Sequence, residues 1–535
     1  MTPGRVVVLV TALAWTPAGI AAVSVTSDGG SGRVNGFAVH DAGDNWEIEI
    51  YRSFRRTVPK DRVTVTHYGD PRAQVRTEVA AARAKLGAGD VAGRLALARR
   101  AREAGLTITA ALLLHEAAAV GENPKVTAAL AALCPVPKPP ERAAAVAAAP
   151  AFLAAPDDEA KRQALRAHDT VPAAWLPELR RELWAAFAAG QKLGEGDGVI
   201  KHAQFEGKVH VERWARDSAA RERKGPWPLV LSLHGGGRDS GHWKNFAPTA
   251  RKLFAKHLDR FVLVAPTVLA RNYAEWGGNP MEEVFVFRAL DAVKRSFPID
   301  TDRVYVAGNS MGGYGTWHFA GHRGDVFAGA VSSAGGILIG TARGETWGWG
   351  IIGNLRHTAV AFCHGGKDKP APPWSDRTAA KILDGLAEAN PERYPHEFHY
   401  FPEKGHGLPG KAMAACVAFV AERIRDPRPR DLTWEPKRIF NRQFAWLYLD
   451  EPRCFTRVEA RLRANNVIDL DLVGIDGGLS LLLDADLVDL DKPVEVLVGG
   501  ARVFHGRPRP SLRALAESIA DRFDPHLVFT HRIDL

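Results

Sequence analysis

The feature that most constrains this chain is the alternation of short apolar runs with helix-like stretches between Phe205 and Arg425. The runs are rich in β-branched residues and end in turn residues: PLVLSLHGG, FVLVAPT, RVYVAGNS, AGAVSSAGG, TAVAFCHGG and HEFHYFPEKGHG. Stretches such as MEEVFVFRALDAVKRSF separate them. Strands joined through helices pair in parallel, and both faces of a parallel sheet must be covered. The sequence therefore predicts an α/β fold with a doubly wound, mostly parallel sheet over residues 205–425.

The regions on either side have a different texture, and 535 residues are too many for one hydrophobic core. Alternating runs such as NWEIEIY predict a small β module over residues 33–67, and hairpin signals predict a β-rich domain over residues 427–535. Between them, residues 71–135 are alanine-rich and resemble a tetratricopeptide-like helical hairpin, and residues 136–200 are a Pro/Ala linker with an amphipathic helix. One visible repeat cannot bury its own core, so we expect a packing appendage rather than a peptide-binding array.

The first 22 residues have the pattern of a secretory signal peptide. One early cation, Arg5, precedes an apolar stretch and then small residues, with cleavage expected after Ala21 or Ala22. This predicts a secreted or periplasmic protein, and the alternative is a buried N-terminal strand. No later stretch reaches 18 uninterrupted apolar residues, so we expect no membrane span.

Charge and cysteine content narrow the choice of partners. The net charge of +9 is mild over this length and no run of five or more Lys or Arg concentrates it, so we expect a solvated surface and no nucleic-acid partner. The four cysteines lack zinc spacing; Cys363 and Cys416 either pair or remain buried thiols. The acidic stretch DADLVDLDKP lacks the glycine and terminal glutamate of a calcium loop and reads as hairpin surface. The sequence predicts no metal and no cofactor.

One serine stands at a tight bend. In RVYVAGNSMGGYGTWHFA a β-branched run meets a glycine-rich turn and then a helix-like run, with Ser310 at the centre of G-x-S-x-G. This strand–turn–helix pattern is the nucleophile elbow, which holds a serine in a strained conformation with its hydroxyl exposed above the sheet. Gly308 and Gly312 would remove Cβ atoms that collide with the neighbouring strand and helix.

A serine hydroxyl needs a base, and the base needs an orienting acid. His406 lies between two glycines after HEFHYFPEKG, and Asp368 follows the strand-like AVAFCHGG. The order Ser, Asp, His is the order found with nucleophile elbows. Asp376, in the loop that follows, is the alternative acid.

Donors for an oxyanion are expected from two places. The run His234-Gly235-Gly236-Gly237 directly follows a predicted strand, so the backbone N–H groups of Gly236 and Gly237 could line an oxyanion hole, and Met311 N–H would be the second donor. Asn272, Trp276 and Trp347 follow strand ends and are expected to bind substrate, with ordinary packing as the alternative.

These motifs resemble α/β-hydrolases, specifically secreted feruloyl esterases and polyhydroxybutyrate depolymerases, together with predicted peptidases related to the prolyl oligopeptidase catalytic domain. The resemblance implies a serine carboxylesterase acting on a small-molecule or polymer-attached ester through Ser310, Asp368 and His406. A serine peptidase is the second hypothesis. The third is an exported binding or scaffold protein with an inactive core, whose terminal β domains contact carbohydrate or the cell surface.

Overall fold

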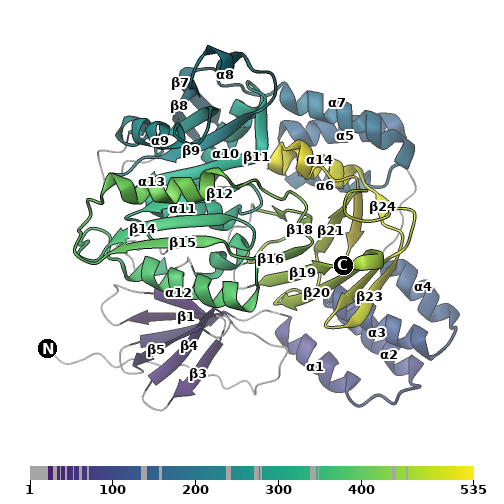
Figure 1. Cartoon of the computed structure of the whole chain (residues 1–535). Coiled ribbons are helices and arrows are strands. Elements are labelled where there is room, and N and C mark those ends of the chain that lie inside the picture. The colour runs from purple at the N-terminus through teal and green to yellow at the C-terminus, as the bar shows by residue number, and fades with distance from the viewer. Residues whose placement is uncertain are drawn as a thin grey trace. The chain divides into compact units, whose positions relative to one another are not determined.

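The structure is a computed structural model that describes residues 22–535 except 28–32, 37, 43–44, 52–53, 60–62, 69–71, 134–140, 156–158, 237–241, 270–275, 278–279, 338–344, 347–348, 437–440 and 454–455 (Figure 1). The chain divides into two compact units. The middle unit comprises residues 185–429 and 522–527, and the terminal unit comprises residues 1–184, 430–521 and 528–535.

The middle unit is built on one eight-stranded sheet with the order β15-β14-β12-β11-β9-β10-β8-β7. The strands from β15 to β10 pair in parallel, while β8 and β7 form an antiparallel edge. The strands are β7 (Gly196–His202), β8 (Phe205–Ala215), β9 (Trp227–Leu233), β10 (Arg260–Pro266), β11 (Ile299–Asn309), β12 (Gly329–Ser333), β14 (Ala359–Gly365) and β15 (His396–Phe401), and a short strand β13 spans Glu345–Thr346. The predicted mostly parallel sheet is therefore present.

Helices cover this sheet, as Figure 1 shows. They are α8 (Ser218–Glu222), α9 (Ala247–Phe254), α10 (Pro280–Lys294), α11 (Met311–His322), α12 (Trp374–Ala389) and α13 (Gly410–Ala421), with short 3-10 turns η3 (Trp243–Asn245), η4 (Trp349–Leu355) and η6 (Pro525–Leu527). Helices α9 and α13 pack on one face, where Val230, Tyr305 and Val331 meet Phe254 and Val417 in a single core cluster. Strands β9, β10, β12 and β14 are buried along their whole length, which is why they read as continuous apolar runs.

The terminal unit combines strands and helices from both ends of the chain. Its N-terminal strands are β1 (Ala22–Ser27), β2 (Arg33–Gly36), β3 (Ala38–Ala42), β4 (Asn45–Tyr51), β5 (Phe54–Pro59) and β6 (Val63–Tyr68), paired antiparallel as β2-β1-β6 and β3-β4-β5. Its helices are α1 (Ala73–Arg83), α2 (Val91–Glu103), α3 (Thr107–Val120), α4 (Pro124–Leu133), α5 (Arg142–Ala154), α6 (Glu159–Ala167), η2 (Ala173–Trp175) and α7 (Leu176–Ala188).

Two five-stranded sheets form the C-terminal part of this unit, in the orders β16-β19-β20-β22-β23 and β17-β18-β21-β25-β24. The elements are β16 (Asp431–Trp434), β17 (Gln443–Phe444), β18 (Leu447–Leu449), β19 (Arg457–Leu462), η5 (Ala464–Asn466), β20 (Val467–Val473), β21 (Leu479–Leu483), β22 (Val494–Val498), β23 (Ala501–Gly506), β24 (Arg509–Pro510), α14 (Leu512–Arg522) and β25 (His531–Asp534). Asn465, Asn466, Gly499 and Gly500 all adopt positive φ, as the two-residue hairpin signals require.

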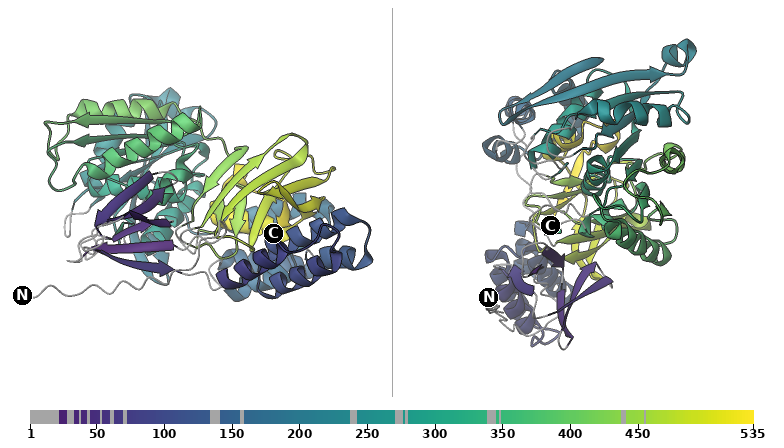
Figure 2. Two further views of the ribbon diagram at one scale, coloured as in Figure 1. Left: turned by 90° about the horizontal axis from the view of Figure 1, so that it is seen from below. Right: turned by 90° about the vertical axis from the view of Figure 1, so that its left-hand side faces the viewer.

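The helices of residues 73–133 lie against these C-terminal strands (Figure 2). The Asp476 carboxylate accepts hydrogen bonds from the Thr109 amide at 2.8 Å and the Thr109 hydroxyl at 2.7 Å, and forms an ion pair with Arg76. The contact joins segments almost 400 residues apart in the chain. Among the helices that the structure describes, none is long and apolar enough to cross a membrane.

Candidate active site

Ser310 is held at a strained corner between β11 and α11. Its φ of 59° and ψ of −120° lie outside the conformations that a serine ordinarily adopts. The flanking glycines make the corner possible: a Cβ on Gly312 would lie 2.0 Å from the Leu233 carbonyl oxygen, and one on Gly308 would lie 2.1 Å from that of Gly312. The strand and the helix therefore approach more closely than side chains would permit.

His406 and Asp368 complete a hydrogen-bonded chain with Ser310. His406 Nε2 lies 2.9 Å from Ser310 Oγ, and His406 Nδ1 lies 2.8 Å from Asp368 Oδ2. An ionised carboxylate only accepts hydrogen bonds, so Nδ1 carries the proton and the Nε2 lone pair faces the serine hydroxyl. The Asp368 side chain is fully buried, whereas the His406 side chain is 32% exposed, as expected of a base that must reach a substrate.

Asp376, the alternative acid, is bonded to other residues. One carboxylate oxygen lies 2.7 Å from His364 Nδ1, and the other accepts a hydrogen bond from Trp317 Nε1 at 3.0 Å. Asp376 sits in the first turn of α12 and is completely buried. The geometry therefore favours Asp368 over Asp376 as the partner of His406.

The loop after β9 lies directly beside the nucleophile. A Cβ on Gly235 would be 2.7 Å from the Asn309 carbonyl oxygen and 3.3 Å from Ser310 Cβ, and Gly236 has a φ of 107°. Gly237 lies outside the described residues. Met311 is the first residue of α11, where backbone N–H groups lack an acceptor within the helix. The loop after β9 and the start of α11 thus both lie beside Ser310.

His234 fixes the shape of this loop, a role that the sequence analysis did not anticipate. Its Nε2 accepts a hydrogen bond from Val268 N at 3.1 Å, so Nδ1 carries the proton and donates to the Gly235 carbonyl at 3.1 Å. Burial lowers the pKa of His234 to about 4, so the ring is neutral at physiological pH. Its position directly before the glycine run was the available signal.

Of the three residues expected to bind substrate, the structure describes Trp276 alone. Asn272 and Trp347 lie outside the described residues. Trp276 is fully buried, and its Nε1 donates a hydrogen bond to the His234 carbonyl at 3.0 Å. The side chain thus supports the glycine loop from behind, which differs from the expected place in a pocket wall.

Cys363 and Cys416 are both free and buried in this unit. The neighbouring Cys363 thiol and burial raise the pKa of the Cys416 thiol, so it stays protonated. Of the two alternatives left by the sequence, the structure has the buried thiols.

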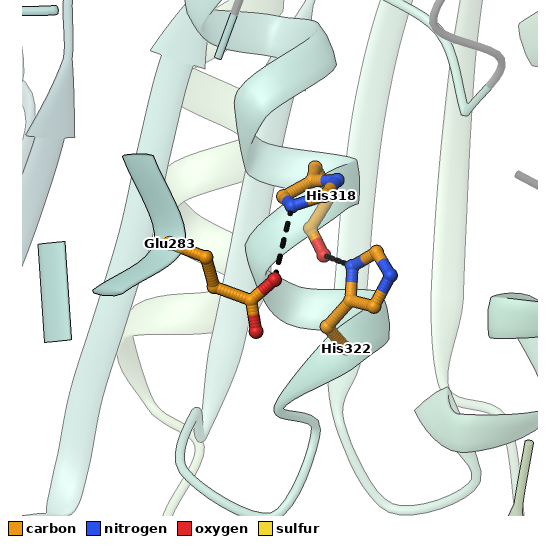
Figure 3. Close-up of side chains that lie close together, drawn as sticks. All are labelled: Glu283, His318 and His322. Carbon is orange, nitrogen blue, oxygen red and sulfur yellow. Dashed lines mark hydrogen bonds and ion pairs between the residues drawn. The ribbon is translucent and has the colours of Figure 1, made fainter. Parts of the chain in front are cut away.

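Glu283, His318 and His322 form a second buried cluster, shown in Figure 3. Their ligand atoms lie within 4.8 Å of one another, close enough to hold a metal ion. However, His322 Nδ1 hydrogen-bonds to the His318 carbonyl at 2.7 Å, and its other ring nitrogen points away from Glu283. The Arg323 guanidinium lies 3.7 Å from the Glu283 carboxylate and already offers it a positive charge. These contacts favour an ion-pair cluster over a metal centre.

The sheet order, the strained serine and its two partners define the α/β-hydrolase class of fold. A model of the prolyl oligopeptidase family matches residues 269–346, which include β11 and Ser310. A bifunctional acetylxylan esterase/xylanase from Neocallimastix patriciarum is 28% identical over 125 residues, which cover 22% of this chain and 17% of that protein. The chain thus spans only a small part of that relative. The middle unit has an α/β-hydrolase fold, and the two matches support a serine hydrolase enzyme of that superfamily.

Solved structures with some similarity include an S-formylglutathione hydrolase from Staphylococcus aureus, at 19% identity and a TM-score of 0.31, covering 42% of this chain and 97% of that one. A ferulic acid esterase from the anaerobic fungus Anaeromyces mucronatus has 16% identity and a TM-score of 0.31, covering 44% and 94%. These scores are too low to bear on function.

Proposed function

We propose that the middle unit is a carboxylic-ester hydrolase that uses Ser310 as nucleophile, His406 as general base and Asp368 as the orienting acid. The observation that carries the proposal is the hydrogen-bonded chain from Ser310 Oγ through His406 to Asp368, with distances of 2.9 and 2.8 Å. These distances match those that nucleophilic catalysis by serine requires. The strained backbone of Ser310 and the adjacent glycine loop support the same assignment.

The chemistry follows from these positions. Ser310 Oγ attacks the ester carbonyl carbon while its proton passes to His406 Nε2, and Asp368 stabilises the imidazolium that forms. The oxyanion receives hydrogen bonds from the Met311 N–H and from the N–H groups of Gly236 and Gly237. The imidazolium then protonates the leaving alcohol, and the acyl group stays on Ser310. Water, deprotonated by His406, attacks the acyl-enzyme and releases the acid.

Esters are favoured over peptides by two features. The relative from Neocallimastix patriciarum, which is 28% identical over 125 residues, is named an acetylxylan esterase/xylanase. The strands that the structure describes in the terminal unit form two five-stranded sheets and shorter N-terminal sheets, rather than the ring of four-stranded blades that restricts access in prolyl oligopeptidase relatives. We therefore place ester hydrolysis first.

A serine peptidase is the second candidate, because the matching family model is that of the prolyl oligopeptidases. The same three residues would then cleave an amide. An inactive scaffold is the third candidate, and the close contact of Ser310 and His406 argues against it. The proposed signal peptide of residues 1–22 lies almost entirely outside the described residues. Export of the protein is part of the proposal.

The test is a matched panel of aryl, acetyl and feruloyl esters beside dipeptide amides, run with the wild-type protein and with Ser310→Ala. We expect the wild type to hydrolyse esters at rates at least about 100-fold above amides, and Ser310→Ala to lose most of this activity. Faster hydrolysis of the amides would establish the peptidase. Equal ester hydrolysis by the Ser310→Ala variant would refute the assignment of the nucleophile.

The terminal sheets are proposed to contact carbohydrate or a cell surface. The terminal unit contains a cavity of about 360 Å³, and its charged lining pairs Arg166 with Asp450 at 3.1 Å and Arg453 with Glu451 at 2.7 Å. Among the residues that the structure describes, its lining includes no aromatic side chain, which sugar-binding sites commonly use, so the described lining suits a small polar ligand better than a polysaccharide. Calorimetric titration with oligosaccharides tests this contact.

A further inference from the structure

Behind Asp368 lies a second buried histidine–aspartate pair. His364, near the end of β14, is 0% exposed. Its Nδ1 lies 2.7 Å from Asp376 Oδ2, and its Nε2 lies 2.6 Å from the Ala371 carbonyl oxygen and 3.3 Å from Asp368 Oδ2. Two ring nitrogens thus approach the same Asp368 oxygen, Oδ2: His406 Nδ1 at 2.8 Å and His364 Nε2 at 3.3 Å.

The proton positions on His364 follow from its partners. A backbone carbonyl only accepts hydrogen bonds, so Nε2 carries a proton and donates toward Ala371, with Asp368 Oδ2 also within reach. Although burial opposes the charged ring, the hydrogen bond and charge of Asp376 outweigh it, and the pKa of His364 is raised. The ring therefore presents a hydrogen-bond donor close to the Asp368 oxygen that His406 also contacts.

The same contacts fasten the loop that carries Asp368. The Ala371 amide donates to Asp368 Oδ1 at 3.0 Å, and the Ala371 carbonyl accepts from His364. Asp376 in turn accepts a hydrogen bond from Trp317 of α11, the helix that begins directly after Ser310. One buried path thus connects the helix of the nucleophile to the loop of the acid.

We propose that His364, clamped by Asp376, is a positioning residue that holds the Asp368 carboxylate in the orientation His406 needs. This inference rests on the proposed function, because it deepens the role of the same three residues. A side chain that merely filled space between β14 and α12 would affect folding, but it would not act through Asp368.

A double-mutant cycle separates these two roles. His364→Gln is made in the wild type and in Asp368→Asn, and kcat and KM for a p-nitrophenyl ester are measured per folded molecule, with near-UV circular dichroism giving the folded fraction. We expect His364→Gln alone to lower kcat about ten-fold with KM changed less than about two-fold. In the Asp368→Asn background the same substitution should cost less than about two-fold, because the residue it positions is already lost.

Two further variants keep the test decisive if His364→Gln folds poorly. Asp376→Asn leaves His364 in place but weakens its clamp, so a smaller loss of kcat is expected, again vanishing in the Asp368→Asn background. His322→Gln is the matched control, because His322 is another buried histidine of this unit and its Nδ1 hydrogen-bonds to the His318 carbonyl. It should leave kcat per folded molecule unchanged in both backgrounds.

The outcomes are distinct. A kcat within about two-fold of wild type for His364→Gln, or a loss of equal size in the Asp368→Asn background, overturns the positioning role while leaving the proposed function intact. Wild-type turnover by Ser310→Ala, run in the same assay, overturns the proposed function itself. A ten-fold loss that disappears in the Asp368→Asn background supports the inference.

Discussion

A Cβ atom on Gly308 would lie 2.1 Å from the carbonyl oxygen of Gly312, so the position two residues before Ser310 has no room for a side chain. Real Cβ atoms do not approach backbone oxygens this closely, and neither partner is a flexible side chain that could move away. The first turn of α11 packs directly against the end of β11, and Ser310, at the corner between them, has a strained backbone conformation. The glycines are therefore required by packing.

Gly312→Ala tests this close packing. The new methyl group would meet the Leu233 carbonyl oxygen at 2.0 Å, so the helix must shift away from the strand. We expect a stability loss of about 1–3 kcal/mol and a large loss of esterase activity, measured by urea unfolding and ester hydrolysis. Gly385→Ala on α12 is the control, because a Cβ there meets open space, and it should leave activity unchanged. Wild-type activity in Gly312→Ala would contradict the packing argument.

His234 should make stability depend on pH. Its pKa is about 4 in the folded state and about 6.5 in the unfolded state, so the unfolded chain binds more protons between these values. The contribution of the neutral ring is present above pH 6.5 and is lost as the pH falls toward 4, amounting to on the order of 3 kcal/mol. In urea unfolding monitored by tryptophan fluorescence, His234→Gln should lose less stability than wild type between pH 7 and about 4.5. Identical pH dependences would be evidence against the buried neutral ring.

Glu517 anchors a buried charge cluster in the terminal unit. Its carboxylate lies 3.0 Å from each of Arg162, Arg513 and Arg532. Burial alone would raise the pKa of Glu517, but the three charges outweigh it and lower it to about 2. The ion pairs therefore stabilise the fold fully above the ordinary carboxyl pKa, and this contribution is lost as the pH falls through about 2.

Glu517→Gln should accordingly be strongly destabilising at neutral pH, by about 3–5 kcal/mol, because it leaves buried guanidinium groups without their shared counter-charge. Thermal unfolding of the wild type and of Glu517→Gln, at neutral pH and near pH 3, measures the effect. The difference in stability between the two proteins should be smaller at the lower pH. Arg502→Gln removes an exposed partner of Glu495 and serves as the control, with a change below about 1 kcal/mol. A Glu517→Gln variant as stable as wild type would disprove the anchoring role.

The two buried thiols of the middle unit should be inaccessible in the folded protein. Cys363 and Cys416 are both 0% exposed, and thiol reagents require an accessible thiolate. We expect iodoacetamide to label neither residue under native conditions and both in denaturant, as read by peptide mass spectrometry. Labelling of either cysteine in the native protein at the rate found in denaturant would contradict the burial of these two thiols.

Much of the middle unit could be predicted because its signals are local. Each buried strand is a continuous apolar run ending in a turn, and Ser310 stands inside a pattern whose glycines determine the geometry of the bend. His406 and Asp368 could be named because they follow strand ends, and the carboxyl ends of parallel strands meet at one edge of a sheet.

Side-chain contacts that no motif or periodicity signals could not be predicted in this way. The pairing of His364 with Asp376 links the end of a strand to the start of the next helix. No sequence pattern shows that Asp376 pairs with His364 rather than with His406, for which it was the alternative acid. The burial of Trp276 depends on packing against the loop of His234. The ion pair of Arg162 with Glu517 spans about 350 residues, a separation at which sequence spacing carries no information.

The most direct test of the account is labelling with a fluorophosphonate, followed by peptide mass spectrometry to locate the adduct. The proposed chain from Ser310 to His406 and Asp368 predicts a single adduct on Ser310, absent in Ser310→Ala and formed far more slowly in His406→Ala. A folded wild-type protein that takes up no label, or one that carries it on another residue, would contradict the assignment of the nucleophile.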